Sequence, residues 1–158
     1  MDLSPIELSP IGVVVGGRNE PVDDDWAGVE AHVVLDERFP EDATAGLDGF
    51  SHIEVIFHFD RVDPDHVHVA ARHPRDRADW PAVGIFAQRA KARPNRLGLT
   101  TCELLAVHGR RLHVRGLDAI DGSPVLDIKP AMEEFLPRAE LRQPDWSREL
   151  MSGYWQHG

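Results

Sequence analysis

Short apolar stretches, many of them alternating with polar residues, recur along most of the chain. They are rich in β-branched side chains and are separated by Gly, Pro or Asp, which is typical of strands joined by turns. Gly109, between the fifth and sixth stretches, predicts a tight hairpin. A series of short strands favours a barrel or a sandwich, and closure of a barrel removes exposed strand edges. The predicted strands are residues 11–15, 29–35, 53–59, 83–87, 101–107, 112–116 and 125–128.

Helical periodicity is limited to two segments. Residues 41–47 form a short candidate, and a second helix is predicted after Pro144. There, Trp146, Leu150, Met151 and Tyr154 fall on one side of a helix and form an apolar stripe. This stripe has two possible partners, the protein's own barrel or a second subunit.

The chain of 158 residues fits one globular domain. We expect a single domain over residues 1–158, mainly β, folded as a small closed or half-open β-barrel. Its core spans about residues 10–131, and residues 132–158 form a C-terminal extension with a helix. The single cysteine, Cys102, cannot form an intramolecular disulfide and lies in an alternating strand, so we predict a core residue. No signal peptide or membrane span is evident, and a cytoplasmic location is expected.

The net charge of −10 is unevenly distributed. Residues 1–65 hold sixteen acidic and three basic side chains, whereas residues 66–129 hold six acidic and eleven basic ones. The acidic total therefore does not exclude an anion-binding surface in the middle of the chain. Seven basic residues cluster there, namely Arg72, Arg75, Arg77, Arg89, Lys91, Arg93 and Arg96.

Several common sites are not predicted. The glycines between residues 12 and 17 lack the spacing of a dinucleotide or phosphate-binding loop. His66 and His68 would share one face of a strand, yet no clear third ligand accompanies them, so no metal site is expected. No serine lies on a nucleophile elbow.

Two stretches carry candidate chemistry. In residues 83–99 a strand runs into a basic loop, where Pro94 restricts the backbone around Arg93 and Asn95. The Asn95 amide matches an adenine edge, although it can equally cap its own turn. In residues 116–130, Asp118, Asp121 and Asp127 surround a tight turn. These carboxylates can bind a ribose diol or an amino group or accept a proton, or they can serve the turn and pair with Lys129.

These two stretches closely resemble motifs of the TsaA-like family, also called TrmO. The family pattern Gly-Val-Phe-Ala-Thr-Arg…Arg-Pro-Asn-Pro-Ile-Gly corresponds to Gly-Ile-Phe-Ala-Gln-Arg at residues 84–89 and Arg-Pro-Asn-Arg-Leu-Gly at 93–98. The pattern Leu-Asp-x-x-Asp-Gly-Thr-Pro-Val-x-Asp-Ile-Lys-Pro-Tyr corresponds to residues 117–131, which end in Ala. Shorter matches at residues 10–12, 49–53 and 72–75 extend the resemblance over residues 10–131.

The resemblance implies a short, single-domain member of a family of S-adenosylmethionine-dependent tRNA methyltransferases. Such proteins are β-barrels that form homodimers, bind the cofactor near the subunit interface and methylate N6 of threonylcarbamoyl-adenosine beside the tRNA anticodon. The implied partner is therefore a tRNA anticodon loop. The cofactor-binding candidates, taken from the resemblance and from the basic loop, are Arg89, Arg93, Asn95, Leu99, Gly116, Leu117 and Asp118, together with Asp25, Trp26, Asp60 and Arg61, whose residue types depart from the family pattern.

The chemistry of methyl transfer suggests roles for some of these residues. A carboxylate or an aromatic face near the sulfonium would stabilise its positive charge, and Asp118 and Trp26 are the candidates. Asp121 or Asp127 could accept the proton that the nitrogen loses. Departures from the pattern at Gln88, Arg96 and Ala131 bear on the acceptor. They leave open methylation of a small molecule, or a barrel that binds S-adenosylmethionine without catalysis.

Overall fold

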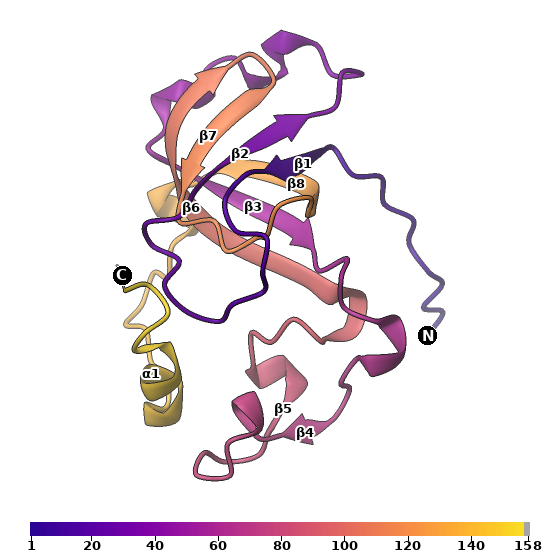
Figure 1. Ribbon diagram of the computed structural model, residues 1–158, viewed down its shortest axis with the longest axis vertical. Helices are drawn as coiled ribbons and strands as arrows, with labels where there is room; N and C mark the ends of the chain where they lie inside the picture. The colour runs from indigo at the N-terminus through magenta and orange to yellow at the C-terminus, as the bar shows by residue number, and fades with distance from the viewer. Residues whose placement is uncertain (157–158) are drawn as a thin grey trace.

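The computed structural model describes residues 1–156, and its centre is a closed antiparallel barrel (Figure 1). Six strands form the barrel in the spatial order β1-β2-β7-β6-β3-β8. The predicted β-barrel is therefore confirmed, and it is the closed form. The strands are β1 (Gly12–Val15), β2 (Glu30–Leu35), β3 (His52–His58), β6 (Leu97–His108), β7 (Arg111–Arg115) and β8 (Pro124–Pro130).

Alternation of side chains along the strands builds the core. In β3 every second residue, Ile53, Val55 and Phe57, is buried, and the facing positions of β6 follow the same rule. The hairpin predicted at Gly109 joins β6 to β7, and that glycine has a φ of +56°. The buried cluster also includes Cys102, which confirms its prediction as a core residue.

A long excursion leaves the barrel between β3 and β6. It carries the two-stranded sheet of β4 (Ala71–Arg72) and β5 (Val83–Gly84), which Figure 1 shows below the barrel. Helix α1 (Asp145–Met151) lies on the same side of the barrel. The remaining regular elements are 3-10 turns, at Glu41–Thr44, Leu47–Gly49, Pro64–His66, Pro74–Asp76, Ile85–Ala87, Pro94–Arg96 and Glu133–Phe135.

Three predicted elements differ from the structure. Only two of the residues 83–87 lie in a strand, because the chain turns inward at buried Ile85. The side-chain amide of Gln88 then donates to the Val83 carbonyl oxygen at 2.8 Å. Residues 41–47 form 3-10 turns instead of an α-helix, since Gly46 adopts a φ of +84° between them. The C-terminal helix ends at Met151, so Tyr154 lies in the turn that follows it.

The helical content is small, and no helix within residues 1–156 has both the length and the apolar character that crossing a membrane requires.

Close packing between β3 and β6 gives a test of this core. A Cβ atom added at Gly98 would lie 2.4 Å from Cζ of Phe57, whose ring is fully buried in the core. We expect Gly98→Ala to lower the free energy of unfolding by about 1–3 kcal/mol, which is the usual cost of overpacking. Urea denaturation followed by circular dichroism measures the change.

Gly49→Ala is the matched control, because a Cβ there meets no atom within 4 Å. Equal denaturation midpoints for the two variants would contradict the packing described here.

Candidate functional site

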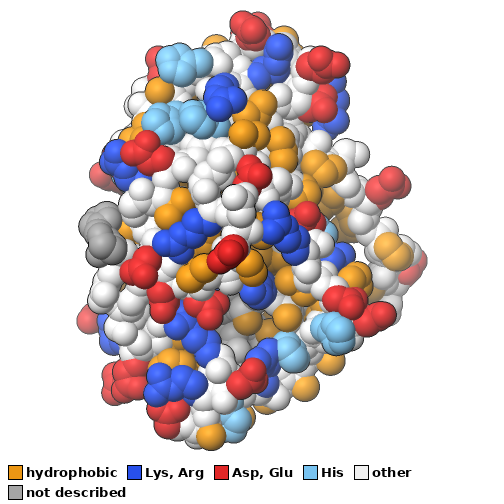
Figure 2. Space-filling view, in the orientation of Figure 1, with side chains coloured by type: hydrophobic (Ala, Val, Ile, Leu, Met, Phe, Trp, Pro, Cys, Tyr) orange, Lys and Arg blue, Asp and Glu red, His pale blue; other side chains and the backbone are white. Residues whose placement is uncertain are grey.

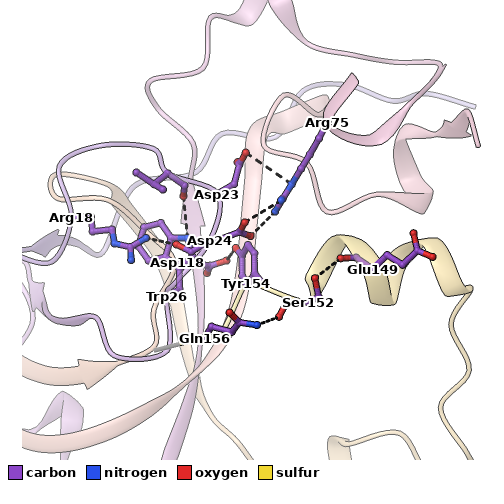
Figure 3. Close-up of polar contacts among 11 residues, drawn as sticks. Arg18, Asp23, Asp24, Trp26, Arg75, Asp118, Glu149, Ser152, Tyr154 and Gln156 are labelled. Atoms are coloured by element: carbon purple, nitrogen blue, oxygen red, sulfur yellow. Dashed lines mark hydrogen bonds and ion pairs between the residues drawn. The ribbon is translucent and has the colours of Figure 1, made fainter. Parts of the chain in front are cut away.

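The carboxylate of Asp118 is the point at which the site is assembled (Figure 3). Asp118 follows β7, and it is only partly buried although its neighbours Leu117 and Ala119 are fully buried. The Thr100 hydroxyl of β6 donates a hydrogen bond to Oδ1, and the Tyr154 hydroxyl donates one to Oδ2. One carboxylate thus joins the barrel to the C-terminal segment.

The C-terminal segment reaches Asp118 because its backbone pairs with an N-terminal loop. The amides of Asp25 and Trp26 donate to the carbonyl oxygens of Gly153 and Tyr154 at 3.1 and 2.9 Å. Earlier in the C-terminal segment, the Glu149 side chain of α1 accepts a hydrogen bond from the Trp80 indole nitrogen of the excursion at 2.8 Å. Tyr154, the last residue of the predicted apolar stripe, therefore contacts the protein's own barrel at Asp118.

The N-terminal loop over residues 18–26 is held by two arginines. Arg18 donates to the carbonyl oxygens of Asp24 and Asp25, and its guanidinium carbon lies 4.6 Å from the centre of the Trp26 ring. Arg75 reaches across from the excursion and binds the Asp24 carboxylate, with Nη2 at 2.9 Å from Oδ1. The loop, the excursion and the C-terminal segment are consequently fixed to one another.

Arg89 and Leu99 lie in the same neighbourhood. The Arg89 guanidinium donates to the Leu99 carbonyl oxygen, one residue before Thr100. Burial, followed by the negative charge of Asp118, raises the pKa of Tyr154, while the positive charges of Arg89 and Arg75 act in the opposite direction. Three predicted residues that are distant in sequence, Arg89, Leu99 and Asp118, are therefore brought together.

The backbone at Gly116 and Leu117 leads into Asp118. The Gly116 amide donates to the Val29 carbonyl oxygen at 2.9 Å, and Gly116 has a φ of +78°, which favours glycine. Leu117 is 1% exposed and belongs to the core cluster. These two residues fix the direction in which the Asp118 side chain leaves the barrel.

Other predicted residues make contacts of their own. Arg93 donates to the Gln88 carbonyl oxygen at 2.7 Å, and Asn95 is exposed with a φ of +63°. Arg61 donates to the carbonyl oxygens of Asn19 and Asp121 at 2.7 and 3.0 Å, while Asp60 is exposed. Their assignment to a cofactor stays a prediction.

Arg96 shows how far the basic loop departs from the family pattern. Its φ is +51°, and its guanidinium donates to the Val62 carbonyl oxygen at 2.7 Å. The pattern has proline at this position, and proline is restricted to φ near about −65°. The loop backbone at residue 96 is therefore one that proline cannot adopt.

The Asp121 and Asp127 carboxylates are engaged elsewhere. The Gly16 amide donates to Oδ1 of Asp121 at 2.7 Å, and the Lys129 ammonium lies 3.6 Å from Oδ2 of Asp127. The Asp127 contact matches the ion-pair alternative, whereas Asp121 binds a backbone amide 105 positions away and does not serve its own turn. A role for either residue as proton acceptor stays a prediction.

The Trp26 side chain is less accessible than a sulfonium contact requires. It is 3% exposed, its indole nitrogen donates to the Val22 carbonyl oxygen at 3.1 Å, and Arg18 covers one face of the ring. Asp118 is accordingly the stronger of the two candidates for stabilising a positive charge.

Thr100 and Tyr154 were not predicted as site residues. Thr100 occupies an ordinary strand position, and Tyr154 was predicted only as the last member of an apolar stripe. No local pattern marks either hydroxyl, because their common partner is Asp118, which lies 18 and 36 positions away.

The histidines near residues 66–73 make contacts with other residues. His66 lies 3.2 Å from Asp63, and His73 bonds to the Trp80 carbonyl oxygen at 2.6 Å. Within residues 1–156, no three His, Cys, Asp or Glu side chains are placed to share a metal ion.

The basic residues of the excursion do not form a continuous positive surface. Arg72 pairs with Asp76 at 2.7 Å, and Arg77 pairs with Asp79. Figure 2 shows Lys and Arg side chains interspersed with Asp and Glu over this face of the molecule. An anionic partner would therefore meet separate positive groups.

Comparison with known proteins identifies the family. The model of the tRNA-methyltransferase O N-terminal domain matches residues 19–135. The chain belongs to this family. A probable S-adenosyl-L-methionine-binding protein of Methanothermobacter thermautotrophicus is 39% identical over 135 residues, covering 82% of this chain and 92% of the relative.

The TrmO family also includes larger proteins. The mouse tRNA (adenine(37)-N6)-methyltransferase is 38% identical over 96 residues, which are 61% of this chain and 22% of the mouse protein. The crystal structure of TrmO from Pseudomonas aeruginosa superposes with a TM-score of 0.73 at 27% identity, covering 89% of this chain and 62% of that one. The matched domain ends at residue 135, so α1 and Tyr154 lie outside it.

The buried thiol beside this site gives a second test. Burial, with a smaller contribution from Asp118, raises the pKa of Cys102 to about 12. Because the thiolate is the reactive form, we expect native protein to resist a thiol reagent at about pH 8 and to react fully in denaturant. Absorbance of the released thiol product measures the rate. Rapid labelling of the native protein would contradict the burial of Cys102 in the barrel.

Proposed function

We propose that this protein is an S-adenosylmethionine-dependent methyltransferase that methylates N6 of adenine in tRNA, with threonylcarbamoyl-adenosine beside the anticodon as its acceptor. The observation that carries the proposal is the convergence of Arg89, Leu99 and Asp118 in a chain of the TrmO family. Relatives named as S-adenosyl-L-methionine-binding proteins and as tRNA (adenine(37)-N6)-methyltransferases support it.

The donor set suits this cofactor. S-adenosylmethionine offers an ammonium, a carboxylate, ribose hydroxyls and a positive sulfonium. Asp118 provides acceptors and a negative charge, and Arg89 provides a guanidinium that suits a carboxylate. When bound, the cofactor supplies a methyl group on sulfur, and this chain's residues orient it toward the acceptor nitrogen. Gly116 and Leu117 hold the backbone that aims Asp118.

The family indicates tRNA as the acceptor, and the distribution of charge indicates how the protein would contact it. The arginines of the excursion are separate groups, several of them paired within the protein. We therefore expect a small contact with the anticodon loop and binding that weakens as salt increases. A small-molecule acceptor would give no such salt dependence and no methylation of tRNA.

Asp118→Asn and Arg89→Ala test the cofactor site. Loss of the negative charge or of the guanidinium should weaken S-adenosylmethionine binding by about tenfold or more, because charged hydrogen bonds contribute about 1.5–3 kcal/mol. Isothermal titration calorimetry measures the dissociation constant. Asp48→Asn, at an exposed carboxylate in the 3-10 turn Leu47–Gly49, is the charge-matched control and should bind like the wild type.

The activity itself is measured with radiolabelled cofactor and tRNA from cells deleted for this gene. Methyl incorporation into adenine is the expected result. Cofactor binding without incorporation into tRNA would overturn the tRNA assignment, and absence of cofactor binding would overturn the proposal as a whole.

We also infer that the protein acts as a homodimer. Along β6 the side chains of Leu97 and Leu99 point outward and are 37% and 50% exposed, beside partly buried Ile56 of β3. Strand β6 pairs with β7 only from Glu103 onward, so β7 does not flank the part of β6 that carries Leu97 and Leu99. A second copy covering this surface, here called the β6 face, would adjoin the site at the Leu99 carbonyl.

Sedimentation equilibrium tests the dimer. Leu99→Glu places a charge on the β6 face and should shift the protein from dimer to monomer, because burial of an unpaired carboxylate opposes association. Val69→Glu introduces the same glutamate at an exposed apolar position of the excursion and should leave the dimer intact. A monomeric wild-type protein, or equal association of the two variants, would overturn the inference.

A further inference from the structure

The two hydrogen bonds to Asp118 leave its carboxylate oriented but not saturated. Thr100 donates to one oxygen and Tyr154 to the other. An ionised carboxylate accepts about four hydrogen bonds through its two oxygens. Each oxygen therefore retains room for a further donor, and the plane of the carboxylate is set by two hydroxyls from separate parts of the chain.

We propose that Tyr154 is a positioning residue, whose hydroxyl holds the Asp118 carboxylate in the orientation that receives the positively charged or hydroxyl groups of S-adenosylmethionine. The inference rests on the proposed function and assigns a role to a residue beyond the matched domain, which ends at residue 135.

The backbone fixes where this hydroxyl lies. The Tyr154 amide donates to Met151 at 3.0 Å, and its carbonyl oxygen accepts from Trp26 at 2.9 Å. The ring also packs edge-on against Trp155, with 4.9 Å between the ring centres. Because these contacts restrain the phenol independently of Asp118, Tyr154 orients the carboxylate more than the carboxylate orients Tyr154.

The protonation state of Tyr154 supports its role as a donor. Burial and the negative charge of Asp118 both raise its pKa, so the phenol keeps its proton at neutral pH. Arg89 and Arg75 supply positive charge nearby, but neither is a hydrogen-bond partner of this hydroxyl among the described residues. The hydrogen of the phenol is thus available to Asp118.

Tyr154→Phe tests the proposal, since it keeps the ring and removes the hydroxyl. We expect the dissociation constant for S-adenosylmethionine to rise by about two- to tenfold, the effect of one hydrogen bond. The KM for the cofactor should rise with it, while kcat at saturating cofactor changes less. Calorimetry and initial rates measure the two effects, and the circular dichroism spectrum reports folding.

A double-mutant cycle separates positioning from a structural role. In an Asp118→Asn background, Tyr154→Phe should have no further effect on the dissociation constant, because the hydroxyl acts through that carboxylate. The same loss in both backgrounds, or an unchanged constant in the single variant, would overturn the proposal. Failure of the wild type to bind the cofactor would instead overturn the proposed function, and this inference with it.

Spectroscopy of the wild-type protein gives a test that needs no substitution. Tyr154 is the one tyrosine of the chain, so tyrosine labelled with carbon-13 at Cζ gives a single resonance to follow. Saturation with S-adenosylmethionine should shift this resonance, because the shared Asp118 carboxylate gains new partners. A resonance that does not move at saturation would contradict the proposal even if Tyr154→Phe failed to fold.

Discussion

The requirement that a partly buried carboxylate be hydrogen-bonded organises this protein outside its barrel. Asp118 emerges between two fully buried residues and cannot be surrounded by water as an exposed aspartate is. One donor comes from β6, which the barrel already positions, and the other must come from a distant segment. That donor is Tyr154, which the backbone hydrogen bonds between the C-terminal segment and the N-terminal loop bring to Asp118.

Each of the surrounding segments is held by contacts that tie it to another segment. The excursion is joined to α1 through Trp80 and Glu149, and to the N-terminal loop through Arg75 and Asp24. The N-terminal loop is joined to the C-terminal turn by backbone hydrogen bonds. The closed barrel supplies a rigid frame. The excursion, the N-terminal loop and the C-terminal segment restrain one another beside it.

The sequence predicted the barrel well because its signal is local. Alternation along β3 or β6 depends only on neighbouring residues and on which side faces the core. Tyr154 and Thr100 carry no comparable signal, since their importance depends on a contact with Asp118 that exists only after folding. The same limitation applies to residues 83–87, where Gln88 replaces strand pairing with side-chain hydrogen bonds. Motif resemblance located Asp118, Arg89 and Leu99, but it gave no indication of Thr100 or Tyr154, whose hydroxyls bind the Asp118 carboxylate.

The loop at Arg96 has a consequence for comparison with other members of the family. The proline ring forbids the left-handed backbone that Arg96 occupies. A relative with proline at this position must therefore follow a different backbone path through the loop, and the side chains that the loop presents would point in other directions.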